Sequence, residues 1–181
     1  NAEEGDEAIL LYDDSREGYL GVPRAYGVYA YTGLKWNNQT SLGGAITSAT
    51  RLPSPYHERV RNPEAQAKFI EDIKNEFKVR DQFVAMATTG SGKTVSALTT
   101  AAHLGRRTLI LVHLQRLMEQ WVEEIHDKLG VPYGKIGIAR QGKCEWEGRD
   151  FTVGLIPSIA RRMYPPAFYD AYGFLIVDEV H

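Results

Sequence analysis

The sequence of 181 residues has a single cysteine, Cys144, and no apolar run that approaches the roughly 18–20 residues needed to cross a bilayer. One cysteine excludes an internal disulfide framework, and no other Cys or His stands at metal-ligand spacing from it, so we interpret Cys144 as a thiol without a special role. The first residues, Asn1 to Gly5, lack the basic and apolar regions of a signal peptide. These absences predict a cytoplasmic protein with no membrane partner, associated with the nucleoid if its source is bacterial or phage.

An excess of basic charge is also lacking, since 21 Lys and Arg stand against 23 Asp and Glu. This balance argues against a uniformly basic nucleic-acid coat, but it leaves room for the local basic track that a motor needs to grip a phosphate backbone. An initial Met is lacking as well, and the sequence stops at His181, directly after an apolar run and two acids. We therefore interpret it as a fragment of a longer polypeptide.

Two parts of the sequence differ in pattern. Residues 1–55 contain short β-rich runs between Gly and Pro turns, with a loop or linker from 37 to 55, and predict a small β-rich accessory module. Residues 56–181 alternate helical and strand patterns, which predicts an α/β fold with a parallel sheet flanked by helices on both faces. One expected helix begins at Asn62, and three others cover 95–104, 114–129 and 158–163. The expected strands lie at 82–86, 108–112, 135–139, 151–156 and 174–177.

A glycine-rich loop, Ala87-Thr88-Thr89-Gly90-Ser91-Gly92-Lys93-Thr94, stands between the apolar run at 82–86 and the helical pattern at 95–104. Strand, loop and helix in this order are the context of a phosphate-binding loop, although Ala87 replaces the first Gly of the general pattern. Gly90 and Gly92 allow backbone N–H groups to surround an anion, and the helix directs its positive end at the same place.

The side-chain chemistry of the loop residues indicates the role of each one. Lys93 is expected over the β and γ oxygens of ATP, and the Thr94 hydroxyl is expected to bind Mg²⁺. The residues predicted to hold the nucleotide are Thr89, Gly90, Ser91, Gly92, Lys93 and Thr94.

Two acids, Asp178 and Glu179, follow the apolar run at 174–177. Ligands of a parallel sheet bind beyond the carboxyl ends of its strands, where the phosphate loop is also expected. Asp178 is predicted to hold Mg²⁺ through water, and Glu179 to orient or deprotonate the attacking water. Lys93, Asp178 and Glu179 are therefore the predicted catalytic residues.

Together these motifs resemble superfamily 2 helicases of the XPB and UvsW type. The glycine-rich loop is similar to their motif I, and Asp178-Glu179-Val180-His181 to their motif II in its Asp-Glu-x-His form. Residues 109–121 are similar to their motif Ia, and residues 153–162 to the segment before motif II. Residues 61–66 are similar to a stretch of this family in which a glutamine, here Gln66, reads adenine.

The resemblance implies that residues 56–181 form the first of two RecA-like P-loop domains, truncated after motif II. It implies an ATP-hydrolysing motor that unwinds or remodels nucleic acid in repair or recombination, with DNA favoured over RNA. ATP and Mg²⁺ are the expected cofactors, and a second RecA-like domain of the same polypeptide the expected partner. Because arginines of that second domain complete the site, we expect the 181 residues alone to bind ATP weakly and to hydrolyse it poorly or not at all. The residues expected to contact the strand are His113, Gln115, Arg116, Ser158 and Arg161.

Three other functions remain open. A duplex translocase subunit of a restriction or packaging machine has the same fold but moves without unwinding. A P-loop kinase of small molecules would need a lid and an acceptor site, and its Asp-Glu-x-His would be accidental. A regulatory nucleotide-binding module would not require the predicted catalytic residues.

The first 55 residues carry aromatic side chains interleaved with basic ones, an arrangement that can stack on bases and contact phosphates. This predicts an accessory element for nucleic-acid recognition, while a small β module with a tyrosine core fits the same residues. The residues concerned are Tyr12, Arg16, Tyr19, Arg24, Tyr26, Tyr29, Tyr31, Lys35 and Trp36.

Overall fold

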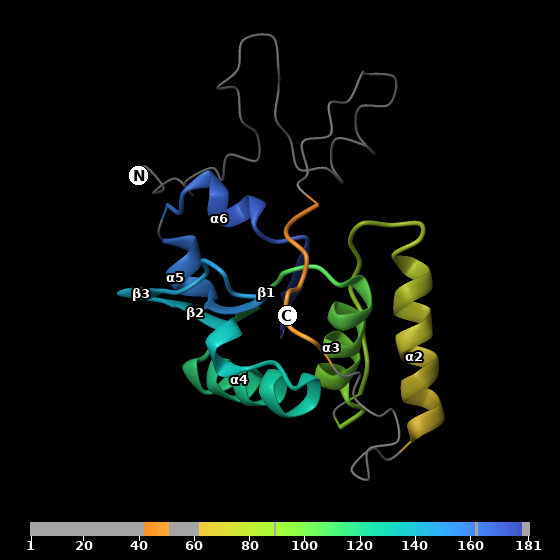
Figure 1. Ribbon diagram of the computed structural model, residues 1–181. Helices are drawn as coiled ribbons and strands as arrows, with labels where there is room; N and C mark the ends of the chain where they lie inside the picture. The colour runs from red at the N-terminus through yellow and green to blue at the C-terminus, as the bar shows by residue number, and fades with distance from the viewer. Residues whose placement is uncertain (1–41, 51–61, 89, 162, 179–181) are drawn as a thin grey trace, which may run out of the picture. The chain divides into compact units, whose positions relative to one another are not determined.

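The computed structural model describes residues 42–50, 62–88, 90–161 and 163–178 (Figure 1). The chain divides into two units, residues 1–39 and 40–181, and all described residues belong to the second. Residues 1–41 and 51–55 of the predicted β-rich module and its linker, together with Thr89, Glu179 and His181, lie outside the described residues. In the part of the chain that is described, no helix has the length and apolarity of a membrane span.

A five-stranded sheet with the order β3-β2-β4-β1-β5 forms the middle of the second unit (Figure 1). Four strands run parallel: β1 (Thr108–Val112), β2 (Ile136–Arg140), β4 (Phe151–Leu155) and β5 (Phe174–Val177). The short β3 (Lys143–Cys144) pairs antiparallel with β2 across a tight turn at Gly142, whose φ is 78°. A turn this short joins only antiparallel neighbours, which is why one edge departs from the predicted parallel order.

Helices cover both faces of this sheet, as predicted (Figure 1). On one face, α3 (Lys93–Leu104) and α4 (Gln115–Leu129) enclose the main core; on the other lie α5 (Ile156–Ala160) and α6 (Pro166–Asp170). The alternation of β1 decides which side chain faces which layer. Ile110 and Val112 belong to the α3/α4 core, whereas Leu109 and Leu111 belong to the cluster around Phe168 of α6.

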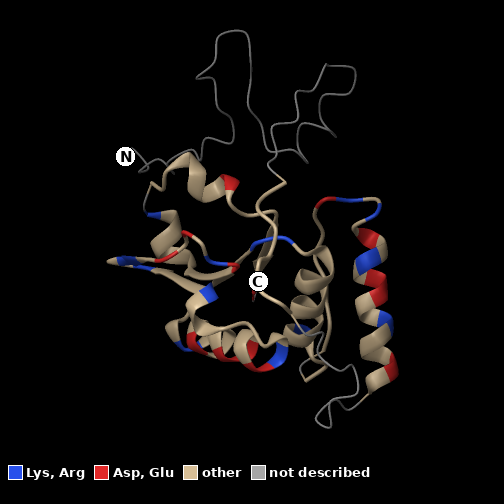
Figure 2. Ribbon diagram, viewed as in Figure 1, with Lys and Arg blue, Asp and Glu red and all other residues tan. Residues whose placement is uncertain are grey.

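Helix α2 (Pro63–Glu76) begins where the sequence predicts it, and it packs on α3. The Asn62 side chain accepts a hydrogen bond from the backbone N–H of Ala65 at 3.0 Å, and Pro63 occupies the first helical position. Acidic and basic side chains alternate along the length of α2 (Figure 2). A short 3-10 turn, Tyr133–Lys135, leads from α4 into β2.

The predicted strand at 82–86 is wrong, because these residues lie outside the sheet. Val84 and Met86 are 72% and 85% exposed, and among the described residues β5 forms the edge of the sheet beside β1. An apolar run becomes a strand only when a neighbour accepts and donates its backbone hydrogen bonds, and composition alone does not supply that neighbour. The phosphate loop therefore follows a segment without regular structure.

Residues 42–48, which we name the strap, lie inside the predicted linker but are attached to the sheet. Backbone hydrogen bonds join Gly44 to Ala171 and Arg107, and Ile46 to Gly105. The fully buried carboxylate of Asp150 accepts from the backbone N–H and the hydroxyl of both Thr47 and Ser48. The composition of residues 37–55, rich in Gly, Ser, Thr, Asn and Pro, predicts a loop there. Hydrogen bonds hold the strap in place, and such bonds leave no apolar periodicity in the sequence that would indicate them.

Candidate functional site

The phosphate loop has the backbone conformation that its glycines predict. Gly90 and Gly92 adopt left-handed φ angles of 78° and 82°, and the N–H of Ser91 donates to the carbonyl of Thr88 at 3.2 Å. Gly92 is the N-cap of α3, and no described side chain caps that helix. The first N–H groups of α3 therefore point out of the helix end, where an anion can accept them.

The surroundings of this loop fit a triphosphate. A Cβ atom placed on Gly90 would meet nothing within 4 Å, so the backbone there is open to close approach. Lys93 is exposed and Thr94 is half-buried, and both lie in the first turn of α3. The buried hydroxyl of Ser91 has no hydrogen-bond partner among the described residues. A positive helix end, an ammonium group and an unused hydroxyl are groups that phosphate oxygens satisfy.

Gln66, the predicted adenine reader, lies on α2 against the phosphate loop. Its side chain is only 2% exposed, and its Nε2 donates to the carbonyl of Gly92 at 3.3 Å and to that of Ser91 at 3.5 Å. A Cβ atom on Gly92 would overlap the same Nε2. The interaction with adenine stays a prediction, while the support of the loop is a role that the sequence pattern does not reveal.

Asp178 directly follows β5, and its backbone N–H donates to Leu111 of β1 at 2.9 Å. Its Oδ2 atom accepts a hydrogen bond from the indole N–H of Trp121 at 2.8 Å. Helix α3, which begins at Lys93, packs against β5, so the helix after the phosphate loop and the strand before Asp178 are neighbours. The sequence pattern predicts Trp121 as a core residue, and its bond to Asp178 is an addition from the structure.

The residues available to a metal ion are few. In the described part of the chain, no group of three or more His, Cys, Asp or Glu could hold a metal. The Thr94 hydroxyl and the Asp178 carboxylate are hard oxygen donors of the kind Mg²⁺ prefers, and Mg²⁺ commonly takes its remaining ligands from phosphates and water. The donor chemistry of this predicted pair therefore suits a magnesium ion that arrives with a nucleotide.

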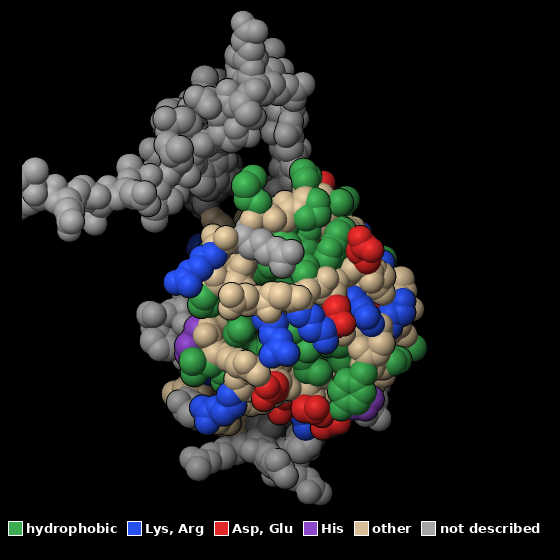
Figure 3. All heavy atoms as spheres, turned by 90° about the vertical axis from the view of Figure 1, so that its left-hand side faces the viewer, with side chains coloured by type: hydrophobic (Ala, Val, Ile, Leu, Met, Phe, Trp, Pro, Cys, Tyr) green, Lys and Arg blue, Asp and Glu red, His purple; other side chains and the backbone are tan. Residues whose placement is uncertain are grey.

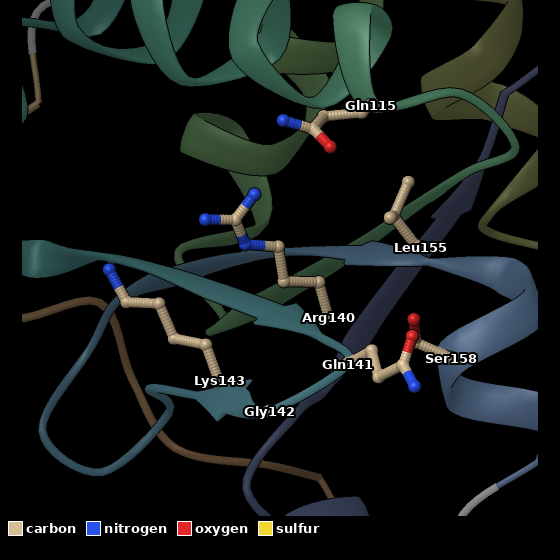
Figure 4. A pocket seen from close by; sticks show the side chains of 7 residues that line it. All are labelled: Gln115, Arg140, Gln141, Gly142, Lys143, Leu155 and Ser158. Atoms are coloured by element: carbon tan, nitrogen blue, oxygen red, sulfur yellow. The ribbon is translucent and has the colours of Figure 1, made fainter.

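A cavity of about 500 Å³ lies at the carboxyl edge of the sheet, between the β2–β3 hairpin, the end of β4 and the first residues of α4 and α5 (Figure 4). Gln115 and Arg140 extend into it from opposite sides (Figure 4). The face of the molecule shown in Figure 3 carries basic side chains with acidic side chains between and beside them. The residues that line the cavity are Gln115, Arg140, Gln141, Gly142, Lys143, Leu155 and Ser158.

The structure thus brings together two of the five residues predicted to contact the strand. Gln115 and Ser158 line the cavity, whereas His113, Arg116 and Arg161 are exposed outside it. Arg140 and Lys143 are basic lining residues that the motifs of the sequence do not include. A polar, Gly-containing turn directly after an apolar strand is the signal that could have indicated them.

A family model described as "Type III restriction enzyme, res subunit" matches residues 59–181, more than half of the chain. The chain belongs to this family. Membership of the family, which is of the superfamily 2 helicase type, confirms the resemblance and the RecA-like α/β fold. The match includes the phosphate loop, the cavity and the acidic strand end.

Relatives of this ResIII domain carry helicase names. L396 of Acanthamoeba polyphaga mimivirus, named as an ATP-dependent RNA helicase, is 33% identical over 92 residues, which cover 51% of this chain and 17% of the relative. QP509L of African swine fever virus has the same type of name and is 27% identical over 105 residues, 55% of this chain and 20% of the relative. Rad25 of Halobacterium salinarum, named as a DNA 3'-5' helicase, is 30% identical over 114 residues, 62% of this chain and 19% of the relative. The chain spans about a fifth of the length of these relatives.

Proposed function

We propose that this ResIII domain is the ATP-binding half of a nucleic-acid motor that hydrolyses ATP and unwinds or remodels DNA. The observation that carries the proposal is the phosphate loop: two left-handed glycines at the uncapped start of α3, with Lys93 and Thr94 in the first turn. The strand β5, which Asp178 directly follows, packs beside that helix. Repair or recombination is the proposed setting of the motor.

Each predicted site residue has a role in this proposal. Thr89 through Thr94 surround the phosphates, with Lys93 placing a compact positive charge on the transferring group. Thr94 and Asp178 hold Mg²⁺, which when bound neutralises charge on the β and γ phosphates. Glu179 orients the attacking water and accepts its proton. Gln66 supports the loop from α2 and reads the base.

Binding of the nucleic acid is assigned to the carboxyl edge of the sheet. Gln115 and Ser158 lie there in the cavity, and His113, Arg116 and Arg161 are proposed to follow the same backbone. The names of the relatives include RNA and DNA helicases. We favour DNA as the nucleic acid. Residues 1–55 are proposed to be an accessory recognition module, and the protein is proposed to be cytoplasmic.

A second RecA-like domain is proposed to complete the ATP site. Its arginines would stabilise the transferring phosphoryl group, an effect worth roughly 10³–10⁵ in rate in phosphoryl-transfer enzymes. Residues 1–181 alone are therefore expected to hydrolyse ATP slowly.

A duplex translocase of a restriction machine is the second candidate, because the family description names a restriction subunit. Both candidates require the same ATP chemistry. A translocase displaces a third strand from duplex DNA without separating the duplex, whereas a helicase separates a forked duplex. An assay of third-strand displacement and an assay of fork unwinding, run side by side, distinguish the two candidates.

The test is ATP hydrolysis by the complete protein with single-stranded DNA, duplex DNA, forked DNA or RNA as the stimulant. We expect stimulation by forked or single-stranded DNA and near-complete loss of hydrolysis in Lys93→Ala. Lys68→Ala is the matched control, since Lys68 is an exposed lysine that pairs with Asp72 on α2. Hydrolysis that survives Lys93→Ala at the wild-type rate would contradict the proposal.

A further inference from the structure

Trp121 links the core of the domain to the predicted metal-binding carboxylate. It lies on α4 with 4% of its surface exposed and packs in the main core with residues of α3, β1 and β4. An indole N–H in such a core needs an acceptor. Here the acceptor is Oδ2 of Asp178, at 2.8 Å, on a residue 57 positions away in the sequence.

We propose that Trp121 is a positioning residue that orients the Asp178 carboxylate for Mg²⁺ and couples α4 to the ATP site. This inference rests on the proposed function. The backbone N–H of Asp178 donates to the carbonyl of Leu111, and its side chain accepts from Trp121. These two bonds fix the position of the Asp178 backbone and of its Oδ2 atom. The indole is an uncharged donor, which orients the carboxylate without neutralising it as Lys or Arg would.

The rigidity of the surroundings makes this orientation effective. Trp121 stands in a stripe of buried side chains on α4 that includes Met118, Ile125 and Leu129, so its ring cannot turn without disturbing the core. Hydrogen bonds from a second layer of residues commonly orient metal ligands, and their loss typically weakens metal affinity or activity roughly 10–100-fold. Because Asp178 is predicted to hold Mg²⁺ through water, an effect at the lower end of this range, about 10-fold, is expected for the Trp121 bond.

Helix α4 also reaches the proposed nucleic-acid surface. It begins at Gln115, which lines the cavity together with Arg140 and Ser158. Trp121 lies six positions after Gln115 on this helix, a rise of about 9 Å. If strand binding displaces α4, the indole moves with the helix, and so does the carboxylate that it holds.

The test compares Trp121→Phe with Trp146→Phe in the complete protein. Phenylalanine keeps an aromatic ring at position 121 but removes the N–H. Trp146 is the matched control, because it packs on Phe168 on the other face of the sheet, with ring centroids 5.8 Å apart. Affinity for a fluorescent ATP analogue is measured over a range of Mg²⁺ concentrations and again with the metal chelated.

We expect Trp121→Phe to raise the Mg²⁺ concentration at half-maximal binding roughly 10-fold or more. Affinity without metal should change little, and Trp146→Phe should match the wild type. In an Asp178→Asn background, Trp121→Phe should have no further effect on the Mg²⁺ dependence. Stimulation of hydrolysis by DNA should fall in Trp121→Phe at saturating Mg²⁺.

An unchanged Mg²⁺ dependence in Trp121→Phe, with or without a lower melting temperature, overturns the positioning role and leaves the proposed function intact. A wild-type protein whose nucleotide affinity does not respond to Mg²⁺ overturns both. If Trp121→Phe fails to fold, replacement of Trp121 by 3-benzothienylalanine, whose sulfur stands in place of the N–H, preserves the shape of the ring. An unchanged Mg²⁺ dependence in this variant then overturns the positioning role, and a raised Mg²⁺ requirement supports it.

Discussion

The side-chain nitrogen of Gln66 lies 3.3 Å from the carbonyl oxygen of Gly92, so α2 supports the phosphate loop at the N-cap of α3. The bond places a buried amide directly against a glycine that has no room for a side chain. It joins the predicted adenine-reading residue and the predicted phosphate-binding residues into one unit. The two glycines of the loop are therefore not equivalent.

Alanine substitutions at Gly92 and Gly90 should separate these two roles. Both residues have left-handed φ angles, so each substitution carries a backbone cost of about 1–2 kcal/mol. Gly92→Ala also drives a Cβ atom into Gln66, whereas a Cβ atom at Gly90 meets open space. We expect Gly92→Ala to weaken nucleotide binding by at least roughly 10-fold more than Gly90→Ala, as measured by titration calorimetry. Equal effects of the two substitutions would show that Gln66 does not constrain the loop.

Arg140→Ala should weaken nucleic-acid binding if the cavity follows the phosphate backbone. Arg140 enters the cavity opposite Gln115 (Figure 4). Removal of one cation that binds a phosphate should lower affinity about equally for all sequences and reduce the slope of log affinity against log salt by about 1. Arg80→Ala is the control, because Arg80 pairs with Glu76 just beyond α2. Identical salt slopes for the two variants, measured by fluorescence anisotropy, would remove the cavity from the binding surface.

Asp150→Asn should lower the free energy of unfolding by about 2–4 kcal/mol, because charge-assisted hydrogen bonds from Thr47 and Ser48 are weakened inside a buried site. The measurement is urea unfolding at neutral pH. Asp72→Asn is the control: Asp72 forms an exposed pair with Lys68, whose removal should cost less than about 1 kcal/mol. A decrease no larger than that of the control would mean that the strap contributes little to stability.

The same site predicts a response to acid. Burial raises the pKa of Asp150, but hydrogen bonds from Ser48 and Thr47 outweigh it and hold the pKa below its ordinary value. A lowered folded pKa means that the stabilisation is present above about pH 4, the ordinary pKa, and is lost as the pH falls through the folded pKa. The difference in unfolding free energy between wild type and Asp150→Asn should therefore shrink below about pH 4. A difference that stays constant through further acidification would contradict this linkage.

Tyr172 predicts a response to alkali. Burial raises its pKa to about 12, from an ordinary value of 10.0. A raised folded pKa means that the associated stability is complete below about pH 10 and is lost between about pH 10 and pH 12. Tyr172→Phe keeps the ring that packs on Phe168 but removes the proton, so its melting temperature should decline less steeply over that interval. Parallel declines for variant and wild type would assign alkaline unfolding to other groups.

Local pattern predicts much of this domain. The strands at 108–112 and 174–177 have the predicted bounds, because each is an apolar run with a polar residue or glycine at both ends. Helix α4 ends before Gly130, which takes the left-handed conformation at its C-cap, as the spacing predicts. The phosphate loop is predictable for the same reason, since its glycines and its helix are contiguous in the sequence.

What the pattern does not predict depends on partners that are distant in the sequence. Residues 82–86 are apolar enough for a strand, but among the described residues they have no neighbouring strand to pair with. Composition alone does not reveal this. The bond between Trp121 and Asp178 joins positions that only the sheet brings together. Arg140 and Lys143 line one cavity with Gln115 and Ser158 because the end of β2 lies near the first residues of α4 and α5, which a linear sequence does not show.

The strap has a practical consequence for anyone who trims the gene. A polypeptide that starts at residue 56 would keep every helix and every sheet strand described above, yet it would lack the four donor groups that Thr47 and Ser48 offer to Asp150. A buried anion stripped of its donors costs several kcal/mol, which is a large share of the stability of an ordinary domain. A start near residue 40 retains those donors, so in energetic terms the domain begins well upstream of its first helix.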